Sequence, residues 1–124
     1  MDWKNKTFQK SLGHAWDGLK IVWQMESNFR RQLLVSVVVL LSGLFFQLHW
    51  MEWIVLVFAI ALVLLMEIWN TTVEYLTDLI TDNHYHILAK RAKDVAAGGV
   101  VLASVIAVLV GMIIFLPKLL NGLL

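Results

Sequence analysis

Cysteine is absent from this 124-residue sequence, proline occurs once, and charged residues make up only 15% of it. The lack of cysteine excludes disulfide bonds and thiolate chemistry. With one proline and no low-complexity tract, we expect a single domain over residues 1–124. A net charge of +1 is too small to favour a nucleic-acid partner. The GxxxxGK[ST] phosphate loop, the HRD and DFG triplets and the GxSxG elbow are also absent, which excludes the designs of soluble kinases.

Long apolar runs are what the sequence has in abundance. Hydrophobic residues make up 60% of it, compared with about 45–50% in a typical soluble domain. Runs over 33–50 and 95–116 contain no acidic or basic residue, and a run over 53–69 is interrupted only by Glu67. At about 1.5 Å per residue, these lengths are comparable with a hydrocarbon core of roughly 30 Å. We therefore predict an all-α integral membrane protein with transmembrane helices over about 31–50, 53–80 and 93–117.

The basic residues predict the orientation of these helices. The sequence has ten Lys and Arg residues, and all but Lys118 fall on one side of the predicted spans: Lys4, Lys6, Lys10, Lys20, Arg30, Arg31, Lys90, Arg91 and Lys93. Because loops rich in Lys and Arg stay in the cytoplasm, we expect a cytoplasmic N-terminus and an external C-terminus. No cleavable signal peptide is recognisable, so we expect the first span to act as an uncleaved anchor.

A different periodicity precedes the first span. Polar and basic residues fill one face of the segment, and apolar residues recur every three or four positions on the other. The apolar residues are Phe8, Leu12, Trp16, Leu19 and Trp23. A basic amphipathic helix that carries tryptophan is typical of the membrane interface. We predict a surface helix over about residues 4–28. The alternative is a helix that packs on a protein partner.

The most informative polar residues come at the end of the second span. They stand at i, i+3, i+4, i+7 and i+11, which is one face of a helix: Glu67, Asn70, Thr71, Glu74 and Asp78. Because Glu67 follows an apolar stretch, we expect it in the cytoplasmic half of the bilayer or at its edge. An ionisable group there is costly and marks a candidate functional site. Alternatively, Glu67 pairs with a basic residue of the bundle, while Glu74 and Asp78 are solvated.

Several carboxylates at an interface, with Lys and Arg nearby, favour a divalent cation that holds a phosphorylated ligand. Mg²⁺ is commonly bound by one or two carboxylates together with substrate phosphates. The loop over 82–94 supplies Lys90, Arg91 and Lys93 as the cationic complement. We expect Lys93 and Asp94 to open the third span, where free backbone N–H groups favour phosphate. The alternative for Lys90 and Arg91 is a solvated cytoplasmic loop.

At these positions the sequence resembles a known family of small membrane enzymes, the prokaryotic diacylglycerol kinases and undecaprenol kinases. The resemblance covers about residues 13–116 and includes the segments 16–19, 26–30 and 92–94. Its most specific part matches the family's E-x-x-N-[ST]-x-x-E-x-x-x-D signature: Glu67, Asn70, Thr71, Glu74 and Asp78. The stretch AKRAKDVAAGG over 89–99 looks closer to members that favour undecaprenol.

The resemblance implies a homotrimer of three-span protomers, each with an amphipathic surface helix, in the plasma membrane of a bacterium. It implies transfer of the ATP γ-phosphoryl group to the hydroxyl of undecaprenol or diacylglycerol, with Mg²⁺, at the cytoplasmic face. A base, bound metal and positioned phosphates agree with what phosphoryl transfer requires.

Residue roles follow from the same resemblance, position by position. Glu67 would be the general base, and Asn70 would position the reacting groups near it. Glu26 and Glu74 would hold the metal on ATP. Asp78 receives no separate role. The remaining nucleotide contacts implied are Tyr85, His86, Lys93, Asp94 and His14. The lipid contacts implied are Glu67, Trp16, Phe29 and Arg30.

Two other classes of function compete with this reading. A small proton-coupled transporter would use Glu67 as its proton site, but it would need polar residues deep in the spans, and the first and third spans are almost wholly apolar. A non-enzymatic assembly or regulatory protein would leave the polar face from Glu67 to Asp78 without a purpose.

Overall fold

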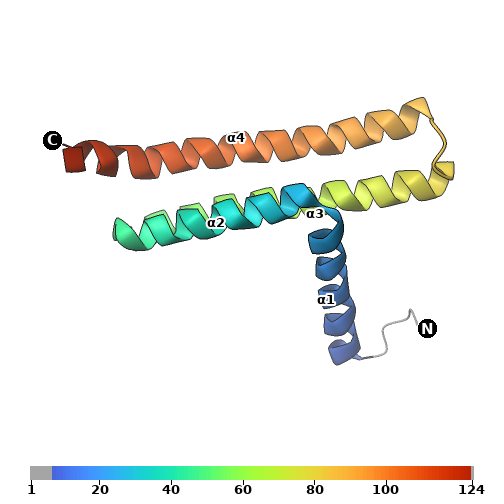
Figure 1. Ribbon diagram of the computed structural model, residues 1–124, viewed down its shortest axis with the longest axis horizontal. Coiled ribbons are helices and arrows are strands. Elements are labelled where there is room, and N and C mark those ends of the chain that lie inside the picture. Colours follow the sequence, from blue (N-terminus) through green and yellow to red (C-terminus); the bar gives the residue numbers. More distant parts are fainter. Residues whose placement is uncertain (1–6, 124) are drawn as a thin grey trace.

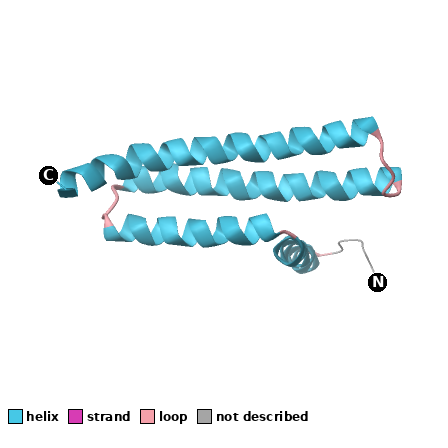
Figure 2. Cartoon of the chain, turned by 45° about the horizontal axis from the view of Figure 1, so that its top comes forward, coloured by secondary structure: helices cyan, strands magenta, loops and turns pink. Residues whose placement is uncertain are grey.

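Residues 7–123 of the computed structural model are described, and within this range the regular secondary structure is all α-helix, joined by short turns. Its elements are α1 (Phe8–Met25), α2 (Ser27–Phe45), α3 (Trp50–Thr81) and α4 (Ile87–Leu123). The last three run side by side, and α1 crosses at a steep angle where α2 begins (Figure 1). Figure 2 views α1 nearly end on, beside the three long helices. Three helices are long and apolar enough to cross a membrane, which confirms the predicted fold class.

The surface helix α1 begins at a capping threonine. The Thr7 side chain accepts a hydrogen bond from the Lys10 N–H at 3.2 Å, which satisfies one of the free N–H groups of the first turn. Phe8, Trp16 and Trp23 remain exposed, as suits a helix that lies on a membrane. Residues 4–6 of the predicted surface helix lie outside the described part of the chain.

The corner between α1 and α2 is held by two residues of α2. The guanidinium of Arg30 donates hydrogen bonds to the carbonyls of Trp23 and Gln24 in the last turn of α1. These carbonyls have no partner within their own helix, so the contact satisfies acceptors that would otherwise need water. Phe29 is buried at the same corner. Together the two residues fix α1 across the start of α2.

At the end away from α1, α2 stops at Phe45, before the predicted residue 50. The chain reverses because Gln47 adopts a left-handed conformation, with φ 52°. His49 and Glu52 then form a capping box that starts α3. An ion pair of 3.0 Å between Lys118 and Glu52 ties α4 to this end of α3.

Close approach of α3 and α4 is made possible by small residues. Ala59 of α3 and Ala96 and Ala103 of α4 are buried, and Gly99 lies against the Met66 side chain. Small side chains let helix backbones pack closely in a membrane, where dispersion contacts replace the hydrophobic effect. The α3–α4 pair is therefore the most extensive helix contact, and α2 packs on it through α3.

The start of α4 differs from the sequence expectation. The helix begins at Ile87, so the prediction that Lys93 and Asp94 open it is wrong. His86 caps it instead: its carbonyl accepts from the Lys90 N–H at 3.0 Å, and its Nδ1 accepts from the Leu88 N–H at 3.1 Å. Residues 87–92 contain no helix breaker, so the helix extends back to the loop.

Candidate active site

The acidic residues of α3 lie at different depths. With 32 residues, α3 is about 48 Å long, which exceeds a hydrocarbon core of roughly 30 Å. Counted from Trp50, Glu67 lies roughly 26 Å along the axis, Glu74 roughly 36 Å and Asp78 roughly 42 Å. Glu67 therefore lies near the end of the apolar stretch that begins at Trp50, and the other two lie beyond it. The polar face runs from the hydrocarbon boundary toward water.

Glu67 is among the most buried polar residues described, with 2% of its surface exposed. Its Oε2 accepts a hydrogen bond of 3.3 Å from Gln32 Nε2, which reaches across from α2. The Thr71 hydroxyl donates to the Glu67 backbone carbonyl at 3.1 Å. No Lys or Arg among the described residues forms an ion pair with Glu67. The structure therefore does not show the alternative in which Glu67 pairs with a basic residue of the bundle.

Glu26, at the corner between α1 and α2, joins this carboxylate group. Burial raises the pKa of Glu26, and the negative charges of Glu74 and then Glu67 raise it further. The Thr71 hydroxyl beside it acts in the opposite direction. Glu26, from the corner between α1 and α2, therefore lies near two carboxyl groups of α3, those of Glu74 and Glu67.

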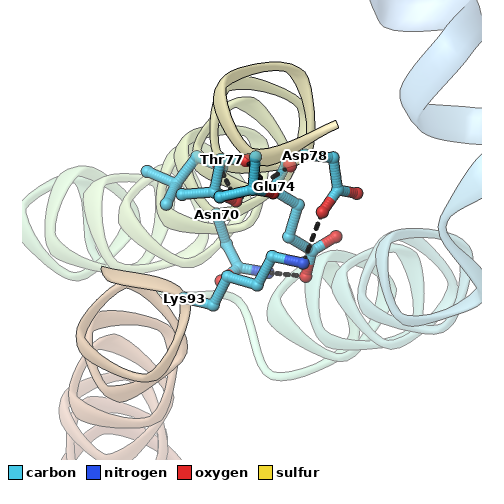
Figure 3. A network of polar contacts seen from close by, with 7 residues as sticks. Asn70, Glu74, Thr77, Asp78 and Lys93 are labelled. Carbon is cyan, nitrogen blue, oxygen red and sulfur yellow. Dashed lines mark hydrogen bonds and ion pairs between the residues drawn. The ribbon is translucent and has the colours of Figure 1, made fainter. Parts of the chain in front are cut away.

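Asn70 lies between Glu67 and Glu74 on the same face and is 8% exposed. Its Nδ2 donates to Glu74 Oε1 at 3.0 Å, a contact drawn in Figure 3. Its Oδ1 is buried and receives no hydrogen bond from the described residues. A buried carbonyl oxygen without a donor is uncommon in folded proteins and is available to a bound group.

Lys93 approaches the same face from α4. Its Nζ forms an ion pair of 2.6 Å with Asp78 Oδ1, one turn beyond Glu74, as Figure 3 shows. Asp94 instead pairs with Lys90 at 2.6 Å on its own helix. The structure thus gives Asp78 a contact, to Lys93, that the sequence did not predict.

The remaining nucleotide candidates lie farther along the chain. Tyr85 and His86 border a hollow of about 440 Å³ at the α3–α4 loop, together with Thr77 and Thr81. His14 is exposed on α1 and makes no hydrogen bond to the described residues. The structure therefore brings four site residues together: Glu26, Glu67, Asn70 and Glu74. His14 forms no hydrogen bond with any of them.

Two of the lipid-contact candidates share a surface. Trp16 and Phe29 border a hollow of about 440 Å³ between α1 and α2. Arg30 lies next in sequence, but its guanidinium is engaged by the carbonyls of α1. Its observed contacts hold the corner together.

A divalent cation fits the Glu26–Glu74 pair. Within the described residues, no three His, Asp or Glu side chains gather closely enough to hold a metal by themselves. Two facing carboxylates are nevertheless the usual protein share of a site whose other ligands are phosphate oxygens. Burial, and then the negative charges of Glu74 and Glu67, raise the pKa of Glu26, and a bound cation would relieve the repulsion among these charges.

Gln32 is the site residue that the sequence analysis missed. It comes directly before the apolar run of α2 and follows Glu26 by less than two helical turns. A polar amide at that position was the available signal, but its contact with Glu67 crosses 35 positions of sequence. No local periodicity reports such a contact.

Comparison with known proteins agrees with the family resemblance of the sequence. The family model described as prokaryotic diacylglycerol kinase matches residues 13–115. The undecaprenol kinase of Bacillus subtilis is 41% identical over 112 residues, which cover 90% of both chains. A diacylglycerol kinase of Synechocystis sp. is 38% identical over 111 residues, or 90% of this chain and 63% of that protein. The diacylglycerol kinase of Escherichia coli is 29% identical over 100 residues, or 81% of each chain.

These relatives are named kinases, and the comparison lends no support to a transporter. The family match spans most of the chain, including the face from Glu67 to Asp78 and the Lys93 position. The protein therefore belongs to the prokaryotic diacylglycerol kinase family.

Proposed function

We propose that this protein transfers the γ-phosphoryl group of ATP to the hydroxyl of undecaprenol, with Mg²⁺ as the metal. Family membership already makes it a multi-pass membrane lipid kinase. The choice of undecaprenol rests on the 41% identical relative that bears that name and is matched over 90% of its length. Diacylglycerol is the second candidate, because relatives at 38% and 29% identity are named for it.

The observation that carries the chemistry is the buried Glu67. A lipid hydroxyl lies at the membrane interface, and Glu67 lies at the inner edge of the apolar core, so the two meet at one depth. Glu67 accepts the proton of the hydroxyl while the lipid oxygen forms a bond to the γ-phosphorus. The bond from that phosphorus to the β–γ bridging oxygen breaks, and ADP leaves with this oxygen. A positioned carboxylate base of this kind contributes typically about 10²–10⁴-fold to a rate.

The groups beyond Glu67 are assigned to ATP. Glu26 and Glu74 hold Mg²⁺, which neutralises charge on the phosphates when it is bound. Asn70 keeps Glu74 oriented through its amide, and its free Oδ1 faces the reacting groups. Lys93 exchanges its contact with Asp78 for a phosphate oxygen. The remaining proposed nucleotide contacts are Asp94, Tyr85, His86 and His14, and the proposed lipid contacts besides Glu67 are Trp16, Phe29 and Arg30.

We place this site on the cytoplasmic side, where ATP is available. The support is the excess of Lys and Arg at this end of the bundle, which predicts a cytoplasmic N-terminus and an external C-terminus. We also propose a homotrimer. Each protomer leaves long rows of large apolar side chains exposed on α2, α3 and α4, which lipid and neighbouring protomers would cover.

The proposed activity is tested by following phosphate transfer from labelled ATP in mixed micelles. Undecaprenol and diacylglycerol are offered separately to the purified protein, with Mg²⁺ and after its removal by a chelator. We expect labelling that depends on the metal, with a higher kcat/KM for undecaprenol. A higher kcat/KM for diacylglycerol would make diacylglycerol the acceptor and leave the assignment as a lipid kinase unchanged. Labelling of neither lipid by a folded preparation would contradict the proposed reaction.

A further inference from the structure

Gln32 holds one specific oxygen of the buried carboxylate. Its Nε2 donates to Glu67 Oε2 at 3.3 Å across the interface of α2 and α3. Hydrogen bonds in catalytic sites are often long before substrates bind and tighten in the complex. Because Oε2 is engaged, Oε1 is the oxygen of Glu67 that stays free for the proton of the lipid hydroxyl. Glu26 lies close enough to Glu67 to be affected by its charge, but an ionised carboxylate supplies no hydrogen-bond donor.

The other end of the same amide is unpaired. Gln32 Oε1 is buried and receives no hydrogen bond from the described residues. Leaving a buried carbonyl oxygen without a donor costs stability, so a purpose for this oxygen is expected. The Glu67 carboxyl supplies a donor for this oxygen during the reaction. An ionised carboxylate only accepts hydrogen bonds, whereas a protonated carboxyl carries an O–H that donates.

We propose that Gln32 is a positioning residue that hydrogen-bonds Glu67 both before and after proton transfer. Nε2 donates to Oε2 of the carboxylate before the transfer. After the transfer, the Glu67 carboxyl rotates to bring its new O–H to Gln32, and the amide, turned over, accepts from this O–H through its Oε1. This inference rests on the role of Glu67 as general base proposed above. Of the neutral side chains, an amide suits this task because it offers a donor and an acceptor at the same reach.

The surroundings give the amide room to turn. Gln32 borders a cavity of about 360 Å³ between α2, α3 and α4, whose lining is almost wholly apolar. Ser36 borders the same cavity, but its hydroxyl donates to the Gln32 backbone carbonyl at 2.7 Å and forms no hydrogen bond with Glu67. Ser36 therefore serves as a matched control for a polar group in the same place.

The test compares Gln32→Met, Gln32→His and Ser36→Ala with the full-length protein in the mixed-micelle assay. Methionine keeps the length of the side chain and removes the donor and the acceptor. Neutral histidine restores one of each. We expect Gln32→Met to lower kcat by about 10–100-fold, the usual loss for a hydrogen bond to a charged group. The KM for ATP and for the lipid stays unchanged. The effect of D₂O on kcat increases, because proton transfer becomes more rate-limiting.

Gln32→His is expected to restore kcat to within about fivefold, and Ser36→Ala to leave it unchanged. Wild-type kcat in Gln32→Met, an effect on KM alone, or an equal loss in Ser36→Ala would overturn the proposal. If Gln32→Met fails to fold, an inactive but folded Gln32→His would also overturn it. Glu67→Gln distinguishes the role of Glu67 from that of Gln32. Wild-type activity in this variant would contradict the assignment of Glu67 as the general base. An inactive Glu67→Gln with a wild-type Gln32→Met contradicts only the positioning role.

Discussion

At the level of single residues, Glu26 shows most clearly how the site conflicts with stability. Its pKa is raised above the ordinary value of 4.5, first by burial and then by the charges of Glu74 and Glu67. A carboxyl whose folded pKa is raised favours the folded state at pH values below its ordinary pKa. That contribution is lost as the pH rises through the raised folded value. At neutral pH, ionised Glu26 therefore destabilises the protein when no metal is bound.

Glu26→Gln is accordingly expected to raise the Tm at pH 7 in the absence of Mg²⁺ and ATP, while it abolishes most of the kinase activity. The gain in Tm should shrink as the pH falls toward 4, where Glu26 is itself protonated. Thermal unfolding in detergent, followed by circular dichroism between pH 4 and 8, measures both trends. Glu52→Gln is the matched control, because Glu52 is paired with Lys118 at the outer end. A lower Tm for Glu26→Gln at pH 7 would contradict the proposed repulsion.

At the level of the elements, the contact between α2 and the start of α3 depends on one glycine. A Cβ at Gly43 would lie 2.7 Å from the Trp53 ring and 3.0 Å from a Leu48 methyl group. Overpacking of this kind typically costs about 1–3 kcal/mol. Gly98 of α4 offers the contrast, because a Cβ there meets nothing within 4 Å.

We expect Gly43→Ala to lower the free energy of unfolding by about 1–3 kcal/mol. Gly98→Ala should instead be neutral or stabilising by up to about 1 kcal/mol, since alanine is the better helix former. Unfolding in detergent mixtures, followed by circular dichroism, compares the two variants directly. Equal stability of the two would show that Gly43 is not a point of close approach.

The elements also show how far the sequence alone predicts this molecule. The long apolar runs predict three spans, and helical periodicity places Glu67, Asn70 and Glu74 on one face. The end of α2 depends on the backbone at Gln47, and the start of α4 depends on capping by His86; neither follows from hydropathy. Contacts between helices, such as Gln32 with Glu67, depend on how the helices pack, which periodicity within a helix does not specify.

At the level of the whole molecule, α3 and α4 extend past α1 at the end that carries the loop between them (Figure 1). If α1 lies on the inner membrane surface, this end reaches into the cytoplasm with Asp78 and Lys93. The sequence has no cysteine, so single introduced cysteines report the orientation without background.

We expect Met51→Cys, at the outer start of α3, to react in intact cells with a maleimide that cannot cross the membrane. His84→Cys, at the α3–α4 loop, should react only after the cells are opened. Both positions are exposed in the structure, so differences in burial do not explain a contrast. Labelling of His84→Cys alone in intact cells would reverse the proposed orientation and place the site outside.

Glu67 is the chemical centre of the proposed lipid kinase, and every other assigned role depends on it. The most direct measurement is kcat for phosphate transfer from ATP to undecaprenol in Glu67→Gln, compared with Glu52→Gln. Both are the same isosteric change on α3, one in its first turn and one near its middle. We predict a loss of at least about 100-fold for Glu67→Gln, as expected for a missing general base, and a nearly unchanged rate for Glu52→Gln. A folded Glu67→Gln protein that keeps most of the wild-type kcat would contradict the account.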